Sequence, residues 1–508
     1  MYWPECIKTG PQLAGRHSIL LRCVLGMGTI LAATVAGRWM SSNPEILLFD
    51  PLRLDHLLVL GGILLSSALL FTKPEPGLLL LVALLYSNAS EVAVRYHGLP
   101  SILQGLGLLL GLAVLGRWLS EPAEPLHFDA SLLFLAAYCF VLFASSIHAA
   151  NPSLADKKLM EHAKGLFTFV LVLNLVRSRV TLDRAVWTIL LVGAALSTIS
   201  AFQVFTSSYD LDFGGFARIK DAQIVGDLRQ SRISGPCADP NFYAQILIPL
   251  IPLGMVRLWS EKSLWRKALG AYGTVACLCA LVFTYSRGAV LALLVMLVVA
   301  LPILRLRLKH CLLGISLLGL SIMLAPRQFE QRLATLAQFV NAKESSTNTD
   351  SSFRQRALLM RAAWEMWREH PFLGVGAGNY AEQYPDFANR VGSTVSSYEE
   401  FGEKRYAHSL YLEIGAETGL AGIVVFSAIL CAAGICGWRA FRSYRRLRDL
   451  KMARLVVSLM IGMLGYLATS LFLHASYPRH LWLLLALVAA SAQIARKAAS
   501  SSEIGGTE

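Results

Sequence analysis

Residues 288–304 read GAVLALLVMLVVALPIL and contain no charged side chain, whereas Arg287 precedes them and Arg305 follows them. The hydrocarbon core of a bilayer is about 30 Å thick, and a helix needs roughly 20 apolar residues to cross it. Lipid cannot satisfy backbone N–H and C=O groups, so a spanning segment must form its own hydrogen bonds. The run lacks the apolar–polar alternation of a barrel strand. It therefore predicts a transmembrane helix with an arginine at each end.

Runs of this kind recur along the whole chain of 508 residues, of which 55% are hydrophobic and 16% charged. The mean hydropathy of +0.53 exceeds what a soluble core requires. We therefore predict an all-α polytopic membrane protein with about 12–14 transmembrane helices and one large loop domain on its outer face. The first run shows no convincing cleavage site and is taken as an uncleaved helix. The predicted spans are 18–37, 55–72, 76–95, 100–119, 130–148, 162–176, 183–205, 241–258, 267–284, 288–304, 309–325, 409–437, 452–473 and 480–497.

The net charge of +13 comes from basic residues that cluster in short connections between apolar runs, most densely at 439–454. The positive-inside rule assigns such connections to the cytoplasm. This placement favours a lipid bilayer over a nucleic acid as the partner of the basic residues, and it predicts that both termini are cytoplasmic. It also places 206–240, 285–287, 326–408 and 474–479 on the outer face. The chain then divides into transmembrane helices (1–205), a core with arginine-bearing outer loops (206–325), the outer loop domain (326–408) and C-terminal helices with a tail (409–508).

The outer segment 326–408 is too long to be a connection without a function. It is predicted to contain an amphipathic helix, because apolar residues recur there at helical spacing. The residues expected on the buried face of this helix are Phe353, Ala357, Met360, Trp364 and Trp367. The helix either lies on the bilayer surface or forms the wall of a substrate cleft.

Basic and imidazole side chains gather in the predicted outer segments. They are Arg232, Arg287, Arg405, His408, His474, Arg479 and His480. Tyr406 lies two residues before His408 and is a further candidate for substrate binding. Imidazole can accept a proton at neutral pH, and guanidinium groups suit phosphate oxygens. One base and several fixed cations describe a site that moves a group from a lipid phosphate or diphosphate to a hydroxyl. The alternative is that Arg287 reaches from a helix end to the interface and that His408 is a cap residue.

Three weaker patterns accompany this site. Glu413 and Glu417 lie four residues apart on one helix face and are candidates for support of His408. Asp210 and Asp212 have the spacing of a metal-binding Asp-x-Asp pair, and GVGAGN (374–379) has the spacing of a dinucleotide fingerprint without its strand and helix. We therefore expect no metal and no cofactor. The scattered cysteines indicate no disulfide framework.

Four motifs together resemble the O-antigen ligase and Wzy-like polymerase superfamily of bacterial inner-membrane glycosyltransferases. They are RISGPCADPNFYA (232–244), TYSRGAVLAL (284–293), RALLMRAAWEMWREHPFLGVGAGNY (356–380) and HSLYLEIGAETGLAG (408–422). The resemblance covers the C-terminal part of the chain, and the N-terminal helices match only as generic spans.

The resemblance implies an outer face that is the periplasm and a metal-independent, inverting transfer. It implies an undecaprenyl-diphosphate-linked glycan as donor, bound by Arg232 and Arg287. His408 is implied to be the base that activates the acceptor hydroxyl, and Arg356 a basic position with a role in binding or structure. The acceptor is a lipid A-core sugar in a ligase, another glycan in a polymerase and a protein hydroxyl in an O-oligosaccharyltransferase; we favour the ligase. A transporter of lipid-linked glycan is the alternative of another class.

Overall fold

A computed structural model describes residues 73–120, 127, 130–225, 228–237, 239–304, 351–388, 390, 406–474 and 478–504. The described residues form two compact units, one from residues 73–81 and 93–127 and one from residues 82–92 and 130–504. The first unit holds α5 (Ile102–Ser120) and parts of two helices, α3 (Pro74–Tyr86) and α4 (Ala89–His97), which continue into the second unit. The site lies in the second unit.

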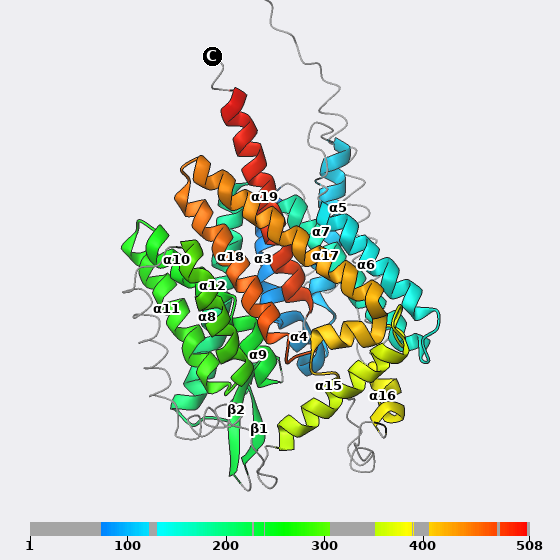
Figure 1. The fold of residues 1–508 in the computed structure, drawn as a ribbon. Coiled ribbons are helices and arrows are strands. Elements are labelled where there is room, and N and C mark those ends of the chain that lie inside the picture. Colours follow the sequence, from blue (N-terminus) through cyan, green and yellow to red (C-terminus); the bar gives the residue numbers. More distant parts are fainter. Residues whose placement is uncertain are drawn as a thin grey trace, which may run out of the picture. The chain divides into compact units, whose positions relative to one another are not determined.

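The second unit is built from helices and one β-hairpin (Figure 1). Its helices before the hairpin are α6 (Ala130–Ser146), α7 (Pro152–Leu175) and α8 (Arg179–Phe205). After the hairpin come α9 (Pro240–Leu247), α10 (Leu250–Ser260), α11 (Leu264–Phe283), α12 (Arg287–Leu304), α15 (Ser351–Glu369), α16 (Tyr380–Ala388), α17 (Leu410–Arg446), α18 (Leu450–Thr469) and α19 (Pro478–Ile504).

The prediction of a polytopic helical membrane protein is confirmed. The described residues contain eight helices long and apolar enough to cross a membrane, or nine if the bent pair α3 and α4 is one span. The predicted spans 18–37, 55–72 and 309–325 lie outside the described residues. The predicted span 162–176 is the second half of α7, whose first half is polar, and α6 is a shorter apolar helix. The described part therefore carries fewer full spans than the apolar runs suggested.

Residues 206–240 are predicted to be a connecting loop, but part of this segment forms an antiparallel hairpin in the structure. Strand β1 (Arg218–Val225) pairs with β2 (Leu228–Gly235), and the register places Lys220 opposite Arg232. Asp239 then caps α9 by accepting a hydrogen bond from the backbone N–H of Asn241 at 2.8 Å, with Pro240 in the first turn. The hairpin thus delivers Arg232 to the start of α9.

The glycine-rich segment that follows α15 is a turn docked on a break in α17. Gly419 has φ 62 and ψ −157, so the helix is interrupted there. The freed carbonyl oxygens of Ala416 and Glu417 accept hydrogen bonds from Val375 and Gly376 at 2.8 and 3.2 Å. In return Leu420 donates its N–H to the carbonyl of Pro371 at 2.7 Å. The GVGAGN sequence therefore satisfies backbone groups of α17 and does not form a dinucleotide-binding loop.

Close approach explains the glycines of this turn. Gly374, Gly376 and Gly378 all have positive φ, and a Cβ at Gly374 would lie 2.3 Å from the backbone carbon of Glu417. Only glycine combines that conformation with that proximity at low steric cost. A side chain from α6 adds to the same contact, since Ser145 donates to the carbonyl of Glu417 at 2.6 Å.

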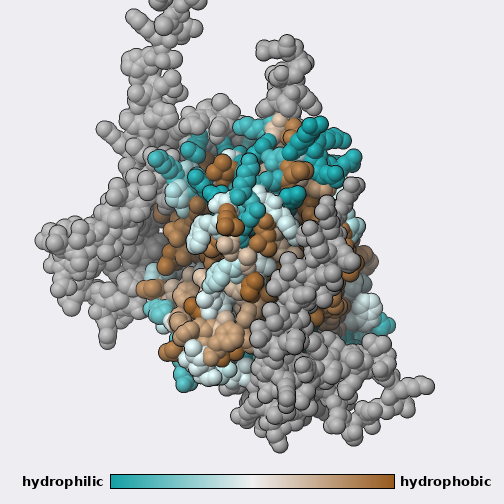
Figure 2. Space-filling model, turned by 90° about the vertical axis from the view of Figure 1, so that its left-hand side faces the viewer, coloured by the Kyte–Doolittle hydropathy of each residue, from teal (hydrophilic) through white to brown (hydrophobic). Residues whose placement is uncertain are grey.

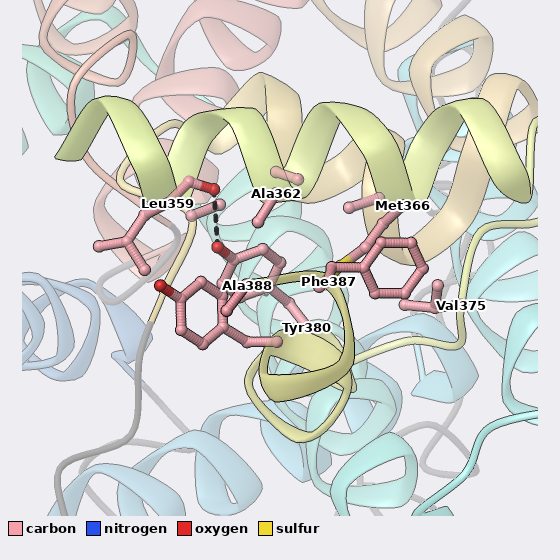
Figure 3. Packing of buried hydrophobic residues seen from close by; sticks show 11 residues of the cluster. Leu359, Ala362, Met366, Val375, Tyr380, Phe387 and Ala388 are labelled. Atoms are coloured by element: carbon pink, nitrogen blue, oxygen red, sulfur yellow. Dashed lines mark hydrogen bonds between the residues drawn. The ribbon is translucent and has the colours of Figure 1, made fainter. Parts of the chain in front are cut away.

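Helices α15 and α16 pack on this turn through a small apolar core, shown in Figure 3. Its members include Leu359, Ala362, Ala363, Met366, Val375, Tyr380, Phe387 and Ala388. The hydroxyl of Tyr380 donates to the carbonyl of Leu359 at 2.7 Å and joins the two helices.

The amphipathic helix is confirmed, but the predicted buried face is wrong. Trp364 is 47% exposed, whereas Ala362 and Ala363 are fully buried. Small alanine side chains let α15 approach its neighbours closely, and Trp367 packs instead over Gly415 of α17.

One end of the second unit carries the basic residues of 439–454. In Figure 1 the hairpin and α15 lie at the lower end, and the connection between α17 and α18 lies at the upper end. Figure 2 shows hydrophilic residues gathered at that upper end above a flank of hydrophobic residues. The basic residues of 439–454 belong to this connection. The candidate site described below therefore lies at the end opposite this basic cluster.

We predict that Gly419→Ala lowers the free energy of unfolding by more than about 1 kcal/mol, because Ala disfavours positive φ. Its Cβ would also lie 2.3 Å from the carbonyl carbon of Phe372. Thermal unfolding of the detergent-purified protein measures the effect. Gly434→Ala in the same helix is the matched control, since a Cβ there meets nothing within 4 Å, and it should be neutral or stabilising. Equal unfolding temperatures for both variants would contradict the docking role of the break.

Candidate active site at one end of the bundle

Arg232 connects two motifs that lie far apart in the sequence. Its side chain is 7% exposed. The Nε and Nη2 atoms donate to the carbonyl of Thr284 at 2.8 and 2.6 Å, and Nη2 also donates to Oδ1 of Asn241 at 3.3 Å. Thr284 ends α11, and Arg287 opens α12 three residues later. The guanidinium of Arg232 is thus held against the turn that carries the second predicted arginine.

The turn between α11 and α12 is tight and nearly buried. Tyr285 has φ 51, an uncommon conformation for a non-glycine residue. Thr284 donates its hydroxyl to the carbonyl of Leu281 at 2.6 Å, and Tyr285 donates its N–H to Val282 at 2.9 Å. Arg287 is half-buried at the first position of its span. This arginine therefore lies at a helix end and not at mid-depth.

Three rings surround the imidazole of His474. Tyr406 stacks on its imidazole with centroids 4.0 Å apart, and Phe242 of α9 meets it edge-on at 5.0 Å. His408 approaches the same imidazole at 5.8 Å in a T-shaped arrangement. Residues from the start of α9, from the approach to α17 and from the segment after α18 are thereby brought together.

His408 stands in a constrained backbone position just before α17. Its φ is 50, and such strain persists only when the surrounding structure holds it. Two bonds hold the adjacent helix start: Leu410 donates to the carbonyl of Ser470 at 2.9 Å, and Glu413 donates to that of Ser409 at 2.9 Å. The Nδ1 atom of His408 is buried and has no hydrogen-bond partner among the described residues.

The charges around His408 favour its neutral form. Burial lowers the pKa of His408 well below the usual value near 6.5, and the positive charge of Arg356 and the presence of His474 lower it further. Asp239 and Glu413 act in the opposite direction and are outweighed. Burial also lowers the pKa of His474. Both imidazoles are therefore uncharged at neutral pH.

Asp239 is a site residue that the motif analysis did not select. Burial raises the pKa of its carboxyl, but Lys220, the backbone N–H of Asn241 and Arg232 together outweigh burial and lower the pKa overall. Lys220 lies 3.4 Å from the carboxylate. An Asp directly before Pro is a helix-start signal and could have located this residue, but nothing in the sequence placed it beside His408.

The remaining predicted residues have different surroundings. Arg479 opens α19 and forms an ion pair with Glu91 and a hydrogen bond with the side chain of Asn88. Its charge is thus balanced by a carboxylate inside the second unit. Arg405 lies outside the described residues. Arg356 is half-buried near the start of α15 and acts electrostatically on His408.

The Asp-x-Asp pair has a local role in the structure. Asp212 accepts a hydrogen bond from the N–H of Gly214 at 3.0 Å and caps a short 3₁₀ helix, Phe213–Gly215. Asp210 is exposed. Within the described ranges no group of three or more His, Cys, Asp or Glu side chains is arranged to hold a metal ion.

A comparison with protein-family models finds a match to part of the chain. Residues 272–427 match the family model described as O-antigen ligase, and no curated protein matches the chain. The matched segment holds Arg287, Arg356 and His408, whereas Arg232 and His474 lie outside it. In the structure these five residues belong to one end of the second unit. The chain is thus a multi-pass membrane protein, and its residues 272–427 match the O-antigen ligase family model.

Proposed function

We propose that this protein is an O-antigen ligase, which transfers a glycan from undecaprenyl diphosphate to a sugar hydroxyl of a lipid A core. The observation that carries the proposal is the convergence of a neutral histidine, His408, with Arg356 and with the Arg232–Thr284 contact next to Arg287. A neutral imidazole and fixed guanidinium groups are what a hydroxyl acceptor and a diphosphate donor require. The family match of residues 272–427 supports the same chemistry.

The arginines would hold the leaving group. Arg232 is preorganised because the carbonyl of Thr284 accepts from two of its nitrogen atoms. Arg287 stands at the first turn of α12, where backbone N–H groups also favour an anion. Fixed donors of this kind stabilise charge that develops on the diphosphate oxygen as its bond to the sugar breaks.

His408 would take the proton of the acceptor hydroxyl. The acceptor oxygen attacks the anomeric carbon of the glycan, and its O–H proton passes to the imidazole. The bond from that carbon to the diphosphate oxygen breaks, and its electron pair leaves with the diphosphate. A single displacement of this kind inverts the anomeric centre. The negative charge of the donor opposes the effect of Arg356 on His408, so the imidazole becomes a stronger base when the donor is bound.

The proposed orientation of the protein in the membrane follows from the basic residues at the end of the bundle opposite His408. The basic residues of 439–454 favour the cytoplasm for the connection between α17 and α18. His408 then faces the periplasm of a bacterial inner membrane, where the lipid-linked donor arrives laterally and the acceptor is presented. Both termini would be cytoplasmic.

The direct test is a transfer assay with purified protein in proteoliposomes. The assay contains undecaprenyl-diphosphate-linked glycan, lipid A core and a chelator. The expected result is glycan on the lipid acceptor. Longer glycan or glycosylated protein, with no modified lipid acceptor, would assign the chain as a polymerase or an O-oligosaccharyltransferase. Movement of labelled lipid-linked glycan across the bilayer without any transfer would support a transporter and contradict the proposal.

We predict that His408→Ala lowers the rate of transfer by about 10²–10⁴-fold, the usual range for loss of a general base. The assay above measures it, with monodispersity and unfolding temperature as checks of folding. His370→Ala is the control, because His370 is an exposed residue at the end of α15. It should transfer at the wild-type rate. Wild-type transfer by a folded His408→Ala protein would remove this residue from the mechanism.

The pH dependence provides a separate prediction. His408 must be neutral to accept a proton, and its lowered pKa keeps it neutral below the usual histidine range near 6.5. The acid limb of kcat/KM for the wild type should therefore lie below that range. Arg356→Gln removes a positive charge that lowers this pKa. The limb should then move to higher pH, by up to about one unit. An unchanged or downward shift would contradict the electrostatic link between the two residues.

A further inference from the structure

One face of α17 is left uncovered by the described residues. Between Leu420 and Trp438, the exposed residues of the helix recur at intervals of three or four, and none of them is charged. A helix turns once every 3.6 residues, so these positions form one stripe along it. The exposed stripe consists of Leu420, Val424, Ser427, Cys431, Ile435 and Trp438, and it continues with Arg442 and Arg445.

The exposed stripe belongs to a peripheral helix of the second unit. Only 28% of the most apolar part of α17 is buried inside the bundle, compared with 78% for α19. Val424 is 56% exposed and Ile435 is 51% exposed. From Leu420 to Trp438 the helix rises about 27 Å, which is close to the thickness of the hydrocarbon core of a bilayer. The uncharged part of the stripe therefore matches lipid acyl chains in chemistry and in length.

The stripe changes from apolar to cationic through an aromatic side chain. Trp438 is 43% exposed and contacts the ring of Phe441, with centroids 5.2 Å apart. The guanidinium of Arg445 lies 5.7 Å from the centroid of the same Phe441 ring. Tryptophan is enriched at membrane–water interfaces, and arginine is enriched just beyond them in cytoplasmic connections. Arg445 therefore lies at the level where lipid phosphates are expected.

The two arginines of the stripe have no carboxylate partner within the described ranges. Asp449 is the only acidic residue of 439–454, and it pairs with Arg179 at 2.8 Å. The side chains of Arg442 and Arg445 are exposed. An anion from outside the chain can therefore reach both guanidinium groups and bind them with charge-assisted hydrogen bonds.

From this geometry we propose that the exposed stripe of α17 is a binding site for an anionic phospholipid. The lipid phosphate contacts Arg442 and Arg445, which lie three residues apart on the same face. One acyl chain follows the stripe from Trp438 to Ser427 over about 16 Å, or half the thickness of the hydrocarbon core. The inference goes beyond the proposed function, because this site lies at the end opposite His408 and takes part in no transfer.

The combination of the two parts selects the class of ligand. A free phosphate or a soluble head group would use the arginines and leave the apolar part of the stripe uncovered. A neutral phospholipid would cover the apolar part and leave two positive charges without a counter-charge. Each arginine near an anionic lipid surface strengthens the attraction about fivefold.

Native mass spectrometry of the full chain in detergent tests the site without any glycan or transfer assay. Phosphatidylglycerol, phosphatidylcholine and soluble glycerol phosphate are titrated separately. The test variant combines Arg442→Gln with Arg445→Gln. The charge-matched control combines Arg361→Gln with Arg368→Gln, two exposed arginines of α15 at the opposite end. Unfolding temperature and monodispersity verify folding.

The expected result is that the wild type and the control bind phosphatidylglycerol more tightly than phosphatidylcholine. The test variant should bind phosphatidylglycerol about 30-fold more weakly, from about fivefold for each arginine. A variant with Arg442→Lys and Arg445→Lys keeps both charges and should retain most of the affinity.

Four results would overturn the proposal. The first is an equal affinity of the wild type and the test variant for phosphatidylglycerol, and the second is an equal loss of affinity in the control. The third is binding of glycerol phosphate as tight as that of phosphatidylglycerol, which would indicate a site for a soluble anion. The fourth is a dimer that the test variant dissociates without any change in lipid binding, which would assign the stripe to a second copy of the chain.

Discussion

The structure depends on backbone hydrogen bonds between the glycine turn and the break in α17. A helix interrupted at Gly419 exposes carbonyl groups that must find donors inside a protein that excludes water. Val375 and Gly376 supply those donors, and Leu420 returns a bond to Pro371. This exchange fastens α15 and α16 to the beginning of the longest helix in the described residues. It also fixes where Glu417 stands, because its carbonyl accepts from the N–H of Gly376 and its carboxylate accepts from the N–H of Tyr380 at the start of α16.

The candidate site depends on these backbone hydrogen bonds and on one side-chain contact. The start of α17 is tied to the end of α18 by the bond from Leu410 to Ser470, which places His408 beside the segment that carries His474. The contact of Arg232 with Thr284 joins the hairpin to the turn before α12. Distant parts of the sequence are thus assembled at one end of the bundle, away from the basic connection at the other end.

Much of this could be predicted from the sequence, and the reasons are physical. Apolar runs as long as a bilayer is thick leave few alternatives to transmembrane helices. The segments between these runs supplied candidate residues, of which His408 and His474 lie together and Arg232 contacts the turn that carries Arg287. The buried face of α15 was mispredicted because the prediction placed the large tryptophans on it. Close helix packing instead selects the small alanine side chains. The hairpin escaped notice because its residues 218–235 lack a clear alternation of polar and apolar residues. The pairings of Arg479 with Glu91 and of Lys158 with Glu413 are tertiary and leave no local signal.

A structure with a non-cleavable donor analogue, determined in lipid nanodiscs, tests the central claim most directly. The account predicts density for the diphosphate between the guanidinium groups of Arg232 and Arg287, with the first sugar facing the imidazole of His408. Diphosphate bound at the opposite end, near the connection between α17 and α18, would contradict the assignment of the active site.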